Sequence, residues 1–322
     1  MNRIAILGAS SQIAKDLILS LAREGCDELL LYVRDVAAMQ HWLAAQGLDL
    51  MVADYAAYDQ EPHDAVLNFV GVGDPQRAAQ MAGAIFDITL QYDELALAGL
   101  RRHPERRYIF LSSGAAYGSS FDQPAGPDTR AAIPINALAP QDYYAVAKLH
   151  AECRHRALPA LAITDLRVFN YFSRTQDLRA RFFITDVLRA IAEGSVLQTS
   201  AAPMVRDYLH PDDFHRMVRC VLRAPPANAA LDCYSAAPVD KGALLAEMQQ
   251  RFGLRYAVQA DPAGIVNATG SKTHYYSLNR QAAELGYLPA YSSIDGIAVE
   301  SGIILGRDTV KTKETKTMGD TR

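Results

Sequence analysis

Short apolar runs alternate with amphipathic stretches over the first half of this chain. The apolar runs have the length of buried strands, and they lie at residues 4–7, 28–33, 50–53, 65–70, 108–111 and 161–169. The stretches between them predict helices at 12–24, 36–46, 75–100 and 141–157. This alternation predicts an α/β fold with helices on both faces of a parallel sheet. Right-handed crossovers then give a doubly wound (Rossmann) sheet.

The pattern becomes less regular after residue 170. It predicts helices at 181–193, 211–223, 241–252 and 279–285, and short strands near Val196 and Leu231. We expect a dinucleotide-binding domain at 1–170, to which 209–235 return. A smaller C-terminal substrate-binding domain is expected at 171–208 and 236–305. The polar, aperiodic residues 306–322 predict a flexible tail, and the Pro-rich stretch 121–140 predicts a loop over the site.

Composition limits the classes of function that fit. The 322 residues are 50% hydrophobic, which is enough for a large core, and the formal net charge of -4 disfavours a nucleic-acid surface. No apolar run has the length of a membrane span, and the four cysteines form no Cys-x-x-Cys pair. We therefore expect a cytoplasmic protein. The eight histidines lack metal spacing, so no metal site is expected.

A turn that suits a phosphate follows the first predicted strand. Residues 8–14 read Gly-Ala-Ser-Ser-Gln-Ile-Ala, and they open a helix whose free N–H groups and dipole favour an anion. Ser11 and Ala14 take the places of the second and third glycines of the usual dinucleotide fingerprint. This match is weak by itself, since a plain strand-to-helix turn reads similarly. The predicted cofactor contacts are Gly8, Ser10, Ser11, Gln12 and Ile13.

Later strand ends indicate which dinucleotide is bound. Arg34 follows the second strand, where an NAD enzyme usually has an acid, and a guanidinium there suits the 2′-phosphate of NADP. The alternative keeps Asp35 as the ribose acid and NAD as the cofactor. Asp54, after the third strand, is predicted to reach the adenine, or else to cap the strand end. Asn68, Val70 and Gly71 should line the cofactor after the fourth strand, with strand-end capping again the alternative.

Tyr144 and Lys148 provide candidate acid/base chemistry. Their spacing places them one turn apart on one helical face, where the ammonium would lower the phenol pKa from about 10. Ser113, at the carboxyl end of an apolar strand, is expected to bind the same substrate oxygen. A Tyr-x-x-x-Lys spacing also arises by chance. Its combination with the strand, the Ser-Ser pair and the glycine turn favours catalysis.

In its ordered motifs the chain resembles the extended short-chain dehydrogenase/reductase family, in particular the nucleotide-sugar epimerases, dehydratases and 4-ketoreductases. The motifs are the 8–14 loop, Leu111-Ser-Ser-Gly-Ala-Ala-Tyr-Gly118, Tyr144-Ala-Val-Ala-Lys148 with Glu152, Leu166-Arg-Val-Phe-Asn170, and Val205-Arg-Asp-Tyr-Leu-His-Pro-Asp-Asp213. The resemblance implies that Tyr144 is the acid/base, that Lys148 binds the nicotinamide ribose and that Ser113 polarises the substrate oxygen. It also implies that Asn170 and Arg206 bind a nucleotide diphosphate. For Arg206 the alternative is a salt bridge with Asp207 or Asp212.

The resemblance also implies a reaction and an assembly. The leading prediction is NADP-dependent reduction of a keto group on a nucleotide-linked sugar, and NAD is possible as the cofactor. The alternative is an epimerase that uses the same residues and a tightly held cofactor. A non-catalytic NADP sensor is a third hypothesis. Residues 113–115, Ser-Gly-Ala, lack the Asp-Glu pair of family dehydratases. Family members commonly dimerise through two long helices, so a homodimer is expected.

Overall fold

The centre of the molecule is a twisted parallel sheet. The structure is a computed structural model that describes residues 2–25, 27–72, 78, 80–118, 121–259 and 272–307. In it, seven strands lie in the order β11-β6-β5-β4-β1-β2-β3, and all neighbours are parallel. They are β1 (Arg3–Leu7), β2 (Glu28–Tyr32), β3 (Met51–Ala53), β4 (Ala65–Asn68), β5 (Arg107–Ser113), β6 (Ala162–Val168) and β11 (Ala229–Asp232). The doubly wound prediction is confirmed.

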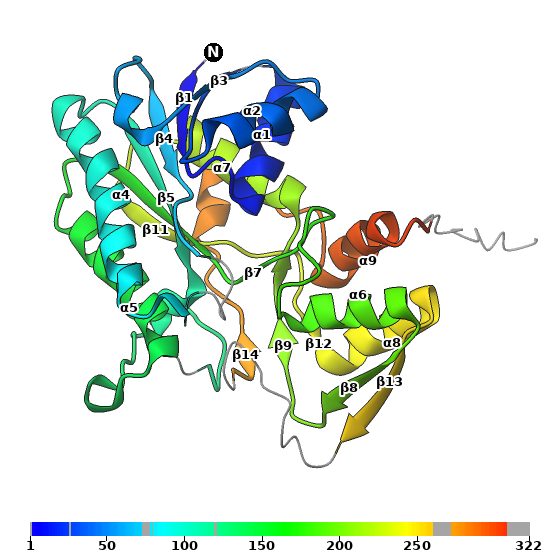
Figure 1. Cartoon of the computed structure of the whole chain (residues 1–322). Helices are drawn as coiled ribbons and strands as arrows, with labels where there is room; N and C mark the ends of the chain where they lie inside the picture. The colour runs from blue at the N-terminus through cyan, green and yellow to red at the C-terminus, as the bar shows by residue number, and fades with distance from the viewer. Residues whose placement is uncertain are drawn as a thin grey trace, which may run out of the picture.

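Helices cover both faces of this sheet (Figure 1). One face carries α1 (Gln12–Glu24), α2 (Val36–Ala45) and α7 (Pro211–Arg223), and the other carries α4 (Ala84–Arg102) and α5 (Pro140–Arg156). Successive strand residues point to opposite faces, so Ile4 and Ile6 enter one core while Ala5 and Leu7 enter the other. Two-sided burial explains why these strands are apolar throughout.

A second group of helices has its own apolar core. It comprises α6 (Phe183–Glu193), α8 (Lys241–Phe252) and α9 (Ser293–Ile304), which bury residues such as Val187, Leu244 and Ile297. Three small sheets accompany these helices. They pair β8 (Val196–Ser200) with β13 (Arg255–Gln259), β7 (Asn170–Tyr171) with β10 (Tyr208–Leu209), and β9 (Val205–Arg206) with both β12 (Val239–Asp240) and β14 (His274–Tyr275). β11 returns to the main sheet beside β6, whereas the division into two domains stays a prediction.

Several predicted elements differ from the observed ones. The long helix begins at Ala84 rather than at residue 75, because the chain turns at Ala82 with a positive φ of 45°; residues 75–77 and 79 lie outside the described part. The last predicted helix is a short 3-10 helix, η4 (Gln281–Leu285). Helix α9 was not predicted. Three further 3-10 turns are η1 (Tyr55–Ala57), η2 (Gly114–Tyr117) and η3 (Ile135–Ala137). No helix in the described ranges is long and apolar enough to cross a membrane.

The turn after β1 depends on the absence of a side chain at Gly8. Gly8 has a φ of 73°, and a Cβ built there would lie 2.8 Å from the backbone carbon of Phe69 and from the nitrogen of Val70. Gly25, which ends α1, has a similar φ of 65° but no heavy atom within 4 Å of such a Cβ. The two glycines share the left-handed backbone, and they differ in the close approach of a second chain segment.

Gly8→Ala should therefore destabilise the protein more than Gly25→Ala. The left-handed conformation alone costs an alanine about 1–2 kcal/mol, and at Gly8 the collision with the loop after β4 adds to this cost. Urea unfolding of both variants measures the difference. Equal losses of unfolding free energy would show that the close approach at Gly8 is not a constraint.

Candidate functional site

The predicted catalytic side chains gather where β5 ends. Ser113 is the last residue of β5, and α5 brings Tyr144 and Lys148 toward it. The Ser113 hydroxyl oxygen accepts a hydrogen bond from the backbone N–H of Ala115 at 3.2 Å, which fixes the side chain at the start of η2. The structure thus places the three predicted residues at the carboxyl edge of the sheet, where open parallel sheets bind ligands.

Lys148 is a buried amine against the end of β5. Its Nζ donates to the carbonyl oxygen of Leu111 at 2.7 Å and lies 5.8 Å from the ring centre of Tyr144. Burial lowers the pKa of Lys148 to about 8, although nearby carboxylates oppose the shift. Burial raises the pKa of Tyr144, and a hydrogen bond with Ser113 opposes that rise. The net shift at Tyr144 is opposite to the one expected from Lys148 alone, because desolvation of the phenol dominates.

Tyr275 is a further hydroxyl at this point that the sequence did not indicate. It lies in β14, and its OH is 3.2 Å from Oγ of Ser113. Its ring packs against Phe121 and Phe169, with centroids 4.8 and 5.2 Å away. Because 162 positions separate Tyr275 from Ser113 and β14 has two residues, no local period could reveal this contact.

Two cations flank the ring of Tyr275. The guanidinium carbon of Arg206 is 6.0 Å from the ring centre, and Nζ of Lys272 is 4.5 Å from it. Arg206 is buried and donates to the carbonyl oxygens of Val205 and Thr273. Burial lowers the pKa of Arg206; burial and the charge of Arg206 lower that of Lys272 to about 8. Across the described ranges neither cation forms an ion pair, so this place suits an anion.

The alternative salt bridge of Arg206 is not formed. The carboxylate of Asp207 instead accepts from the backbone N–H of Ser235 and the hydroxyl of Ser293, and Asp212 lies beside His210. The side-chain amide of Asn170 donates to the carbonyl oxygens of Asp207 and Tyr275. Asn170 therefore ties β7 to the segments that carry Arg206 and Tyr275.

A buried carboxylate anchors the segment that carries Tyr275. Asp232 is 1% exposed and accepts from the hydroxyls of Ser277 at 2.6 Å and Tyr117 at 2.9 Å. Arg167 donates to the hydroxyl of Tyr117 and pairs with both Asp232 and Glu152. Ser277 is two residues from Tyr275, so this network helps to hold Tyr275 beside Ser113.

The predicted cofactor loop is a tight turn that leads into a capped helix. A Cβ at Gly8 would collide with the backbone of Phe69 and Val70, so the turn packs closely on the loop after β4, and Ser11 caps α1 by accepting from the N–H of Ala14. Ser10 is exposed, Ile13 packs against the core, and the amide of Gln12 donates to the hydroxyl of Ser173. A bare turn and a capped helix N-terminus fit a dinucleotide.

The residues after the next three strands have unequal roles. Arg34 is exposed, and no ion pair to it is found in the described part of the chain, whereas Asp35 caps α2. Asp54 caps η1, the 3-10 helix that follows β3, and its contact with the adenine stays a prediction. Asn68 is buried and its Oδ1 accepts from the N–H of Val70, so it organises the loop through the backbone; Gly71 is exposed near Nζ of Lys148.

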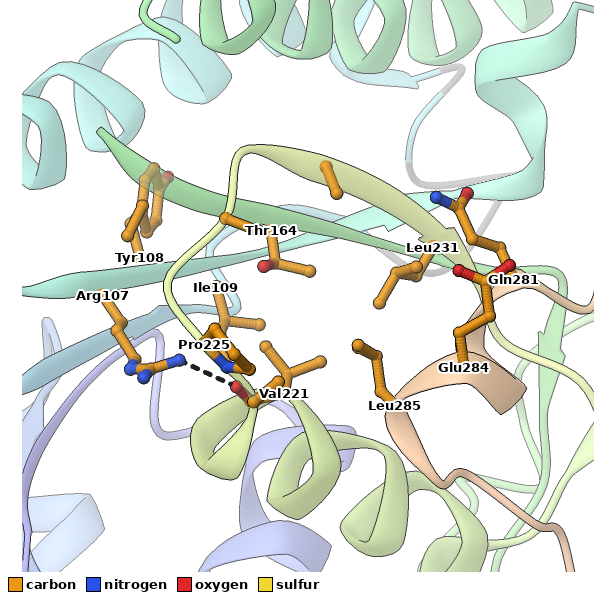
Figure 2. Close-up of a pocket in the computed structure, with 14 residues that line it drawn as sticks. Arg107, Tyr108, Ile109, Thr164, Val221, Pro225, Leu231, Gln281, Glu284 and Leu285 are labelled. Atoms are coloured by element: carbon orange, nitrogen blue, oxygen red, sulfur yellow. Dashed lines mark hydrogen bonds between the residues drawn. The ribbon is translucent and has the colours of Figure 1, made fainter. Parts of the chain in front are cut away.

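A separate cavity of about 140 Å³ lies under the other end of the sheet. Figure 2 shows Ile109, Val221, Leu231 and Leu285 around it, with Arg107 donating to the carbonyl oxygen of Val221. These strand residues lie toward the amino ends of β5 and β11, away from Ser113. In the residues that the structure describes, no group of three or more His, Cys, Asp or Glu side chains could hold a metal ion.

Comparison with known families gives a direct assignment. The model of the NAD dependent epimerase/dehydratase family matches residues 4–236. The chain belongs to this family. The resemblance to extended short-chain dehydrogenase/reductases is thereby confirmed, and the family description implies a nicotinamide cofactor. No curated protein matches the sequence.

Solved structures of this family share the fold at low sequence identity. UDP-glucose 4-epimerase from Bifidobacterium longum, in complex with NAD+ and UDP, has a TM-score of 0.74 and 17% identity over 94% of this chain and 98% of its own. UDP-glucose-4-epimerase from Stenotrophomonas maltophila, with NAD and formylated UDP-arabinopyranose, has a TM-score of 0.76 and 16% identity over 95% and 98%. A UDP-glucuronic acid 4-epimerase mutant from Bacillus cereus has a TM-score of 0.75 and 16% identity over 94% and 98%.

The Asp232 anchor gives a stability prediction. Ser277→Ala removes a hydrogen bond to a buried carboxylate and should lower the free energy of unfolding by about 1.5–3 kcal/mol. Ser301 is equally buried, but its hydroxyl has no hydrogen-bond partner in the part of the chain that the structure describes. Ser301→Ala should therefore stay within about 0.5 kcal/mol of the wild type. Similar losses for both variants in urea unfolding would contradict the anchor.

Proposed function

We propose that this protein is an NAD(P)-dependent epimerase of a nucleotide-linked sugar. The observation that carries the proposal is the convergence of Ser113 and Tyr144 beside Tyr275, whose ring is flanked by Arg206 and Lys272, two cations without an ion pair among the described residues. Acid/base hydroxyls next to an anion site suit a sugar joined to a diphosphate. Family membership and the UDP-sugar epimerases of the same fold also support epimerisation over the reduction that the sequence favoured.

The residues around Gly8 would hold the cofactor. The pyrophosphate would lie at the N-terminus of α1, the loop at 68–71 would line the dinucleotide, and Lys148 would face the nicotinamide ribose. NAD(P), when bound, supplies a hydride acceptor and donor. The roles of the protein residues are to position the sugar and to move the proton of its hydroxyl.

Tyr144 is the proposed acid/base. As the phenolate, Tyr144 would remove the proton from the sugar hydroxyl, and as the resulting phenol it would return the proton after the configuration has changed, while Ser113 donates a hydrogen bond to the same oxygen. Proton transfer of this kind typically contributes about 10²–10⁴-fold to the rate. The ammonium of Lys148 would stabilise the phenolate against the desolvation that raises the pKa of Tyr144.

Arg206 is the proposed anchor of the diphosphate, with Lys272 as a second cation and Asn170 as the residue that positions both segments. Both side chains are desolvated and lack carboxylate partners among the described residues, so phosphate oxygens would gain strong charged hydrogen bonds. We propose that residues 171–208 and 236–305 form the substrate-binding domain around this site.

Dehydratase chemistry does not fit the end of β5. Family dehydratases place an acid directly after the catalytic hydroxyl, and here that position is Gly114. A Cβ at Gly114 would lie 2.3 Å from the ring of Phe169, so a side chain there would require this ring to move. This packing, together with the absence of acids at 114 and 115, disfavours a dehydratase.

A second candidate is reduction of a keto sugar with NADPH. Arg34 favours it, because an exposed guanidinium after β2 suits a 2′-phosphate, while Asp35 is occupied as a helix cap. The sensor hypothesis has no comparable support, since a sensor does not need Ser113, Tyr144 and Lys148 together.

We also propose a homodimer through the outer faces of α4 and α5, where Leu90 is 40% exposed.

Tyr144→Phe tests the chemistry. The variant keeps the ring and removes the reacting hydroxyl, so turnover of UDP-glucose or UDP-glucuronic acid should fall about 10²-fold or more. The Kd of the sugar nucleotide and the Kd of NAD(P)H should change little. Tyr143→Phe is the matched control, because its ring packs on Phe86 from the neighbouring position. Product without net NAD(P)H consumption would select the epimerase, and stoichiometric oxidation the reductase. Full activity of Tyr144→Phe would overturn both.

Arg206→Ala tests the substrate class. Loss of charged hydrogen bonds worth about 1.5–3 kcal/mol should weaken UDP binding roughly ten- to hundred-fold and leave NAD(P)H binding intact. The control Arg179→Ala removes an exposed arginine that pairs only with Asp177 in the described structure, and it should bind both ligands normally. Unchanged UDP affinity, measured by titration calorimetry, would rule out a diphosphate at Arg206.

A further inference from the structure

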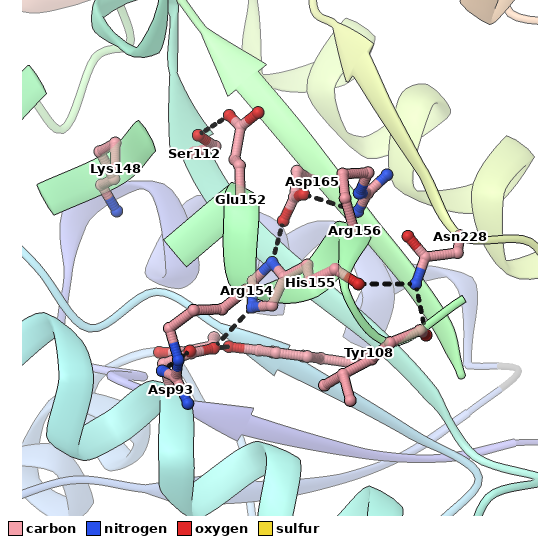
Figure 3. Close-up of polar contacts among 12 residues, drawn as sticks. Asp93, Tyr108, Ser112, Lys148, Glu152, Arg154, His155, Arg156, Asp165 and Asn228 are labelled. Carbon is pink, nitrogen blue, oxygen red and sulfur yellow. Dashed lines mark hydrogen bonds and ion pairs between the residues drawn. The ribbon is translucent and has the colours of Figure 1, made fainter. Parts of the chain in front are cut away.

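A histidine on α5 is buried between two carboxylates that the proposed reaction does not use. His155 is completely buried, with Nδ1 2.6 Å from Asp165 on β6 and Nε2 2.7 Å from Asp93 on α4. Figure 3 shows His155 between them, with Arg154 directed at Asp93 and Arg156 at Asp165. The cluster joins the neighbouring helices α4 and α5 to β6, the strand next to the edge strand β11.

The geometry determines the charge of His155. An ionised carboxylate only accepts hydrogen bonds, so a ring with both nitrogens on carboxylates must donate from both, and the imidazole is then protonated. The two aspartates raise the pKa of His155 to about 9 against the effect of burial. A buried imidazolium stabilises the cluster at neutral pH, because it offsets the charges of two carboxylates that have left water.

The cluster is connected to the loop after β4 by a series of side-chain hydrogen bonds. The hydroxyl of Tyr108 donates to Asp93 at 3.0 Å and accepts from the side-chain amide of Asn68 at 3.0 Å. The Oδ1 of Asn68 in turn accepts from the N–H of Val70 at 2.9 Å. His155, Asp93, Tyr108 and Asn68 therefore form one unbroken series of contacts from α5 to a backbone amide.

The loop that ends this series lies between two parts of the candidate site. Its backbone at Phe69 and Val70 is where a Cβ on Gly8 would collide, and a Cβ on Gly71 would lie 3.6 Å from Nζ of Lys148. A small shift of the loop would therefore change the space at the Gly8 turn and the surroundings of Lys148.

We propose that His155 is a positioning residue: with Asp93, Tyr108 and Asn68 it clamps the loop at 68–71 in the place that binds the dinucleotide. Tyr108 is the coupling group, because its hydroxyl joins the carboxylate of Asp93 to the side-chain amide of Asn68, which in turn holds the loop. The effect on cofactor affinity rests on the proposed NAD(P) site. The effect on the loop itself does not.

Tyr108→Phe removes the coupling hydroxyl and keeps the ring. Loss of one such hydrogen bond should speed hydrogen exchange of the Val70 amide about two- to ten-fold in the full-length protein without ligand. It should weaken NAD(H) or NADP(H) binding by a similar factor and leave UDP affinity unchanged. Asn68→Ala removes the acceptor of the Val70 amide directly, so it should give the largest increase in the exchange rate of that amide.

Tyr58→Phe is the matched control. Tyr58 is also buried on the α4 side of the sheet, but its hydroxyl has no hydrogen-bond partner among the described residues. It should leave both Val70 exchange and cofactor affinity at the wild-type level. Any general loosening of this layer would affect both tyrosine variants, whereas the clamp affects only Tyr108→Phe.

The possible results separate the clamp from the proposed function. Faster Val70 exchange in Tyr108→Phe and not in Tyr58→Phe supports the clamp, whether or not the wild type binds NAD(P)H. Exchange that responds to Asn68→Ala but not to Tyr108→Phe would overturn it, because Asn68 would then hold the loop alone. A wild type that binds neither NAD(H) nor NADP(H) would overturn the proposed function instead.

Discussion

Helix α5 buries a stripe of polar side chains against the sheet, and most of the site depends on how that stripe is paired. Tyr144, Lys148, Glu152 and His155 follow one another at spacings of four, four and three residues, so they share one helical face. Surface helices normally turn such residues to solvent. Here Lys148, Glu152 and His155 are all at most 4% exposed.

The buried charged members of this stripe are paired with two neighbouring strands, β5 and β6. Lys148 donates to the backbone of β5, Glu152 pairs with Ser112 on β5 and Arg167 on β6, and His155 pairs with Asp165 on β6. Buried charges are costly without partners, so sliding α5 by one residue would leave several of them unpaired. The requirement to pair the stripe thus specifies the register of α5 and places Tyr144 beside Ser113.

The substrate side of the site is assembled by equally distant contacts. Arg167 joins the α5 stripe to Asp232, and Asp232 holds Ser277, which lies next to the segment with Tyr275. The network from Glu152 through Arg167 and Asp232 therefore reaches Ser277, and the contact between the hydroxyls of Tyr275 and Ser113 joins this segment to the end of β5. This continuity explains how a strand of two residues such as β14 is held in place without a large sheet of its own.

Much of the fold follows from the sequence, because its signals are local. The bounds of α1, α7 and α8 are those that the apolar period predicts, and the strands of the main sheet differ from prediction by a few residues at their ends. The glycine turn, Ser113 and the Tyr144 to Lys148 spacing are local patterns too, and the predicted motifs meet at one edge because parallel strands end there. Tyr275, Lys272 and the partners of His155 were decided by tertiary structure. Their contacts join residues far apart in the chain, or depend on which face of a helix is buried in the folded protein. Neither property produces a local period in the sequence.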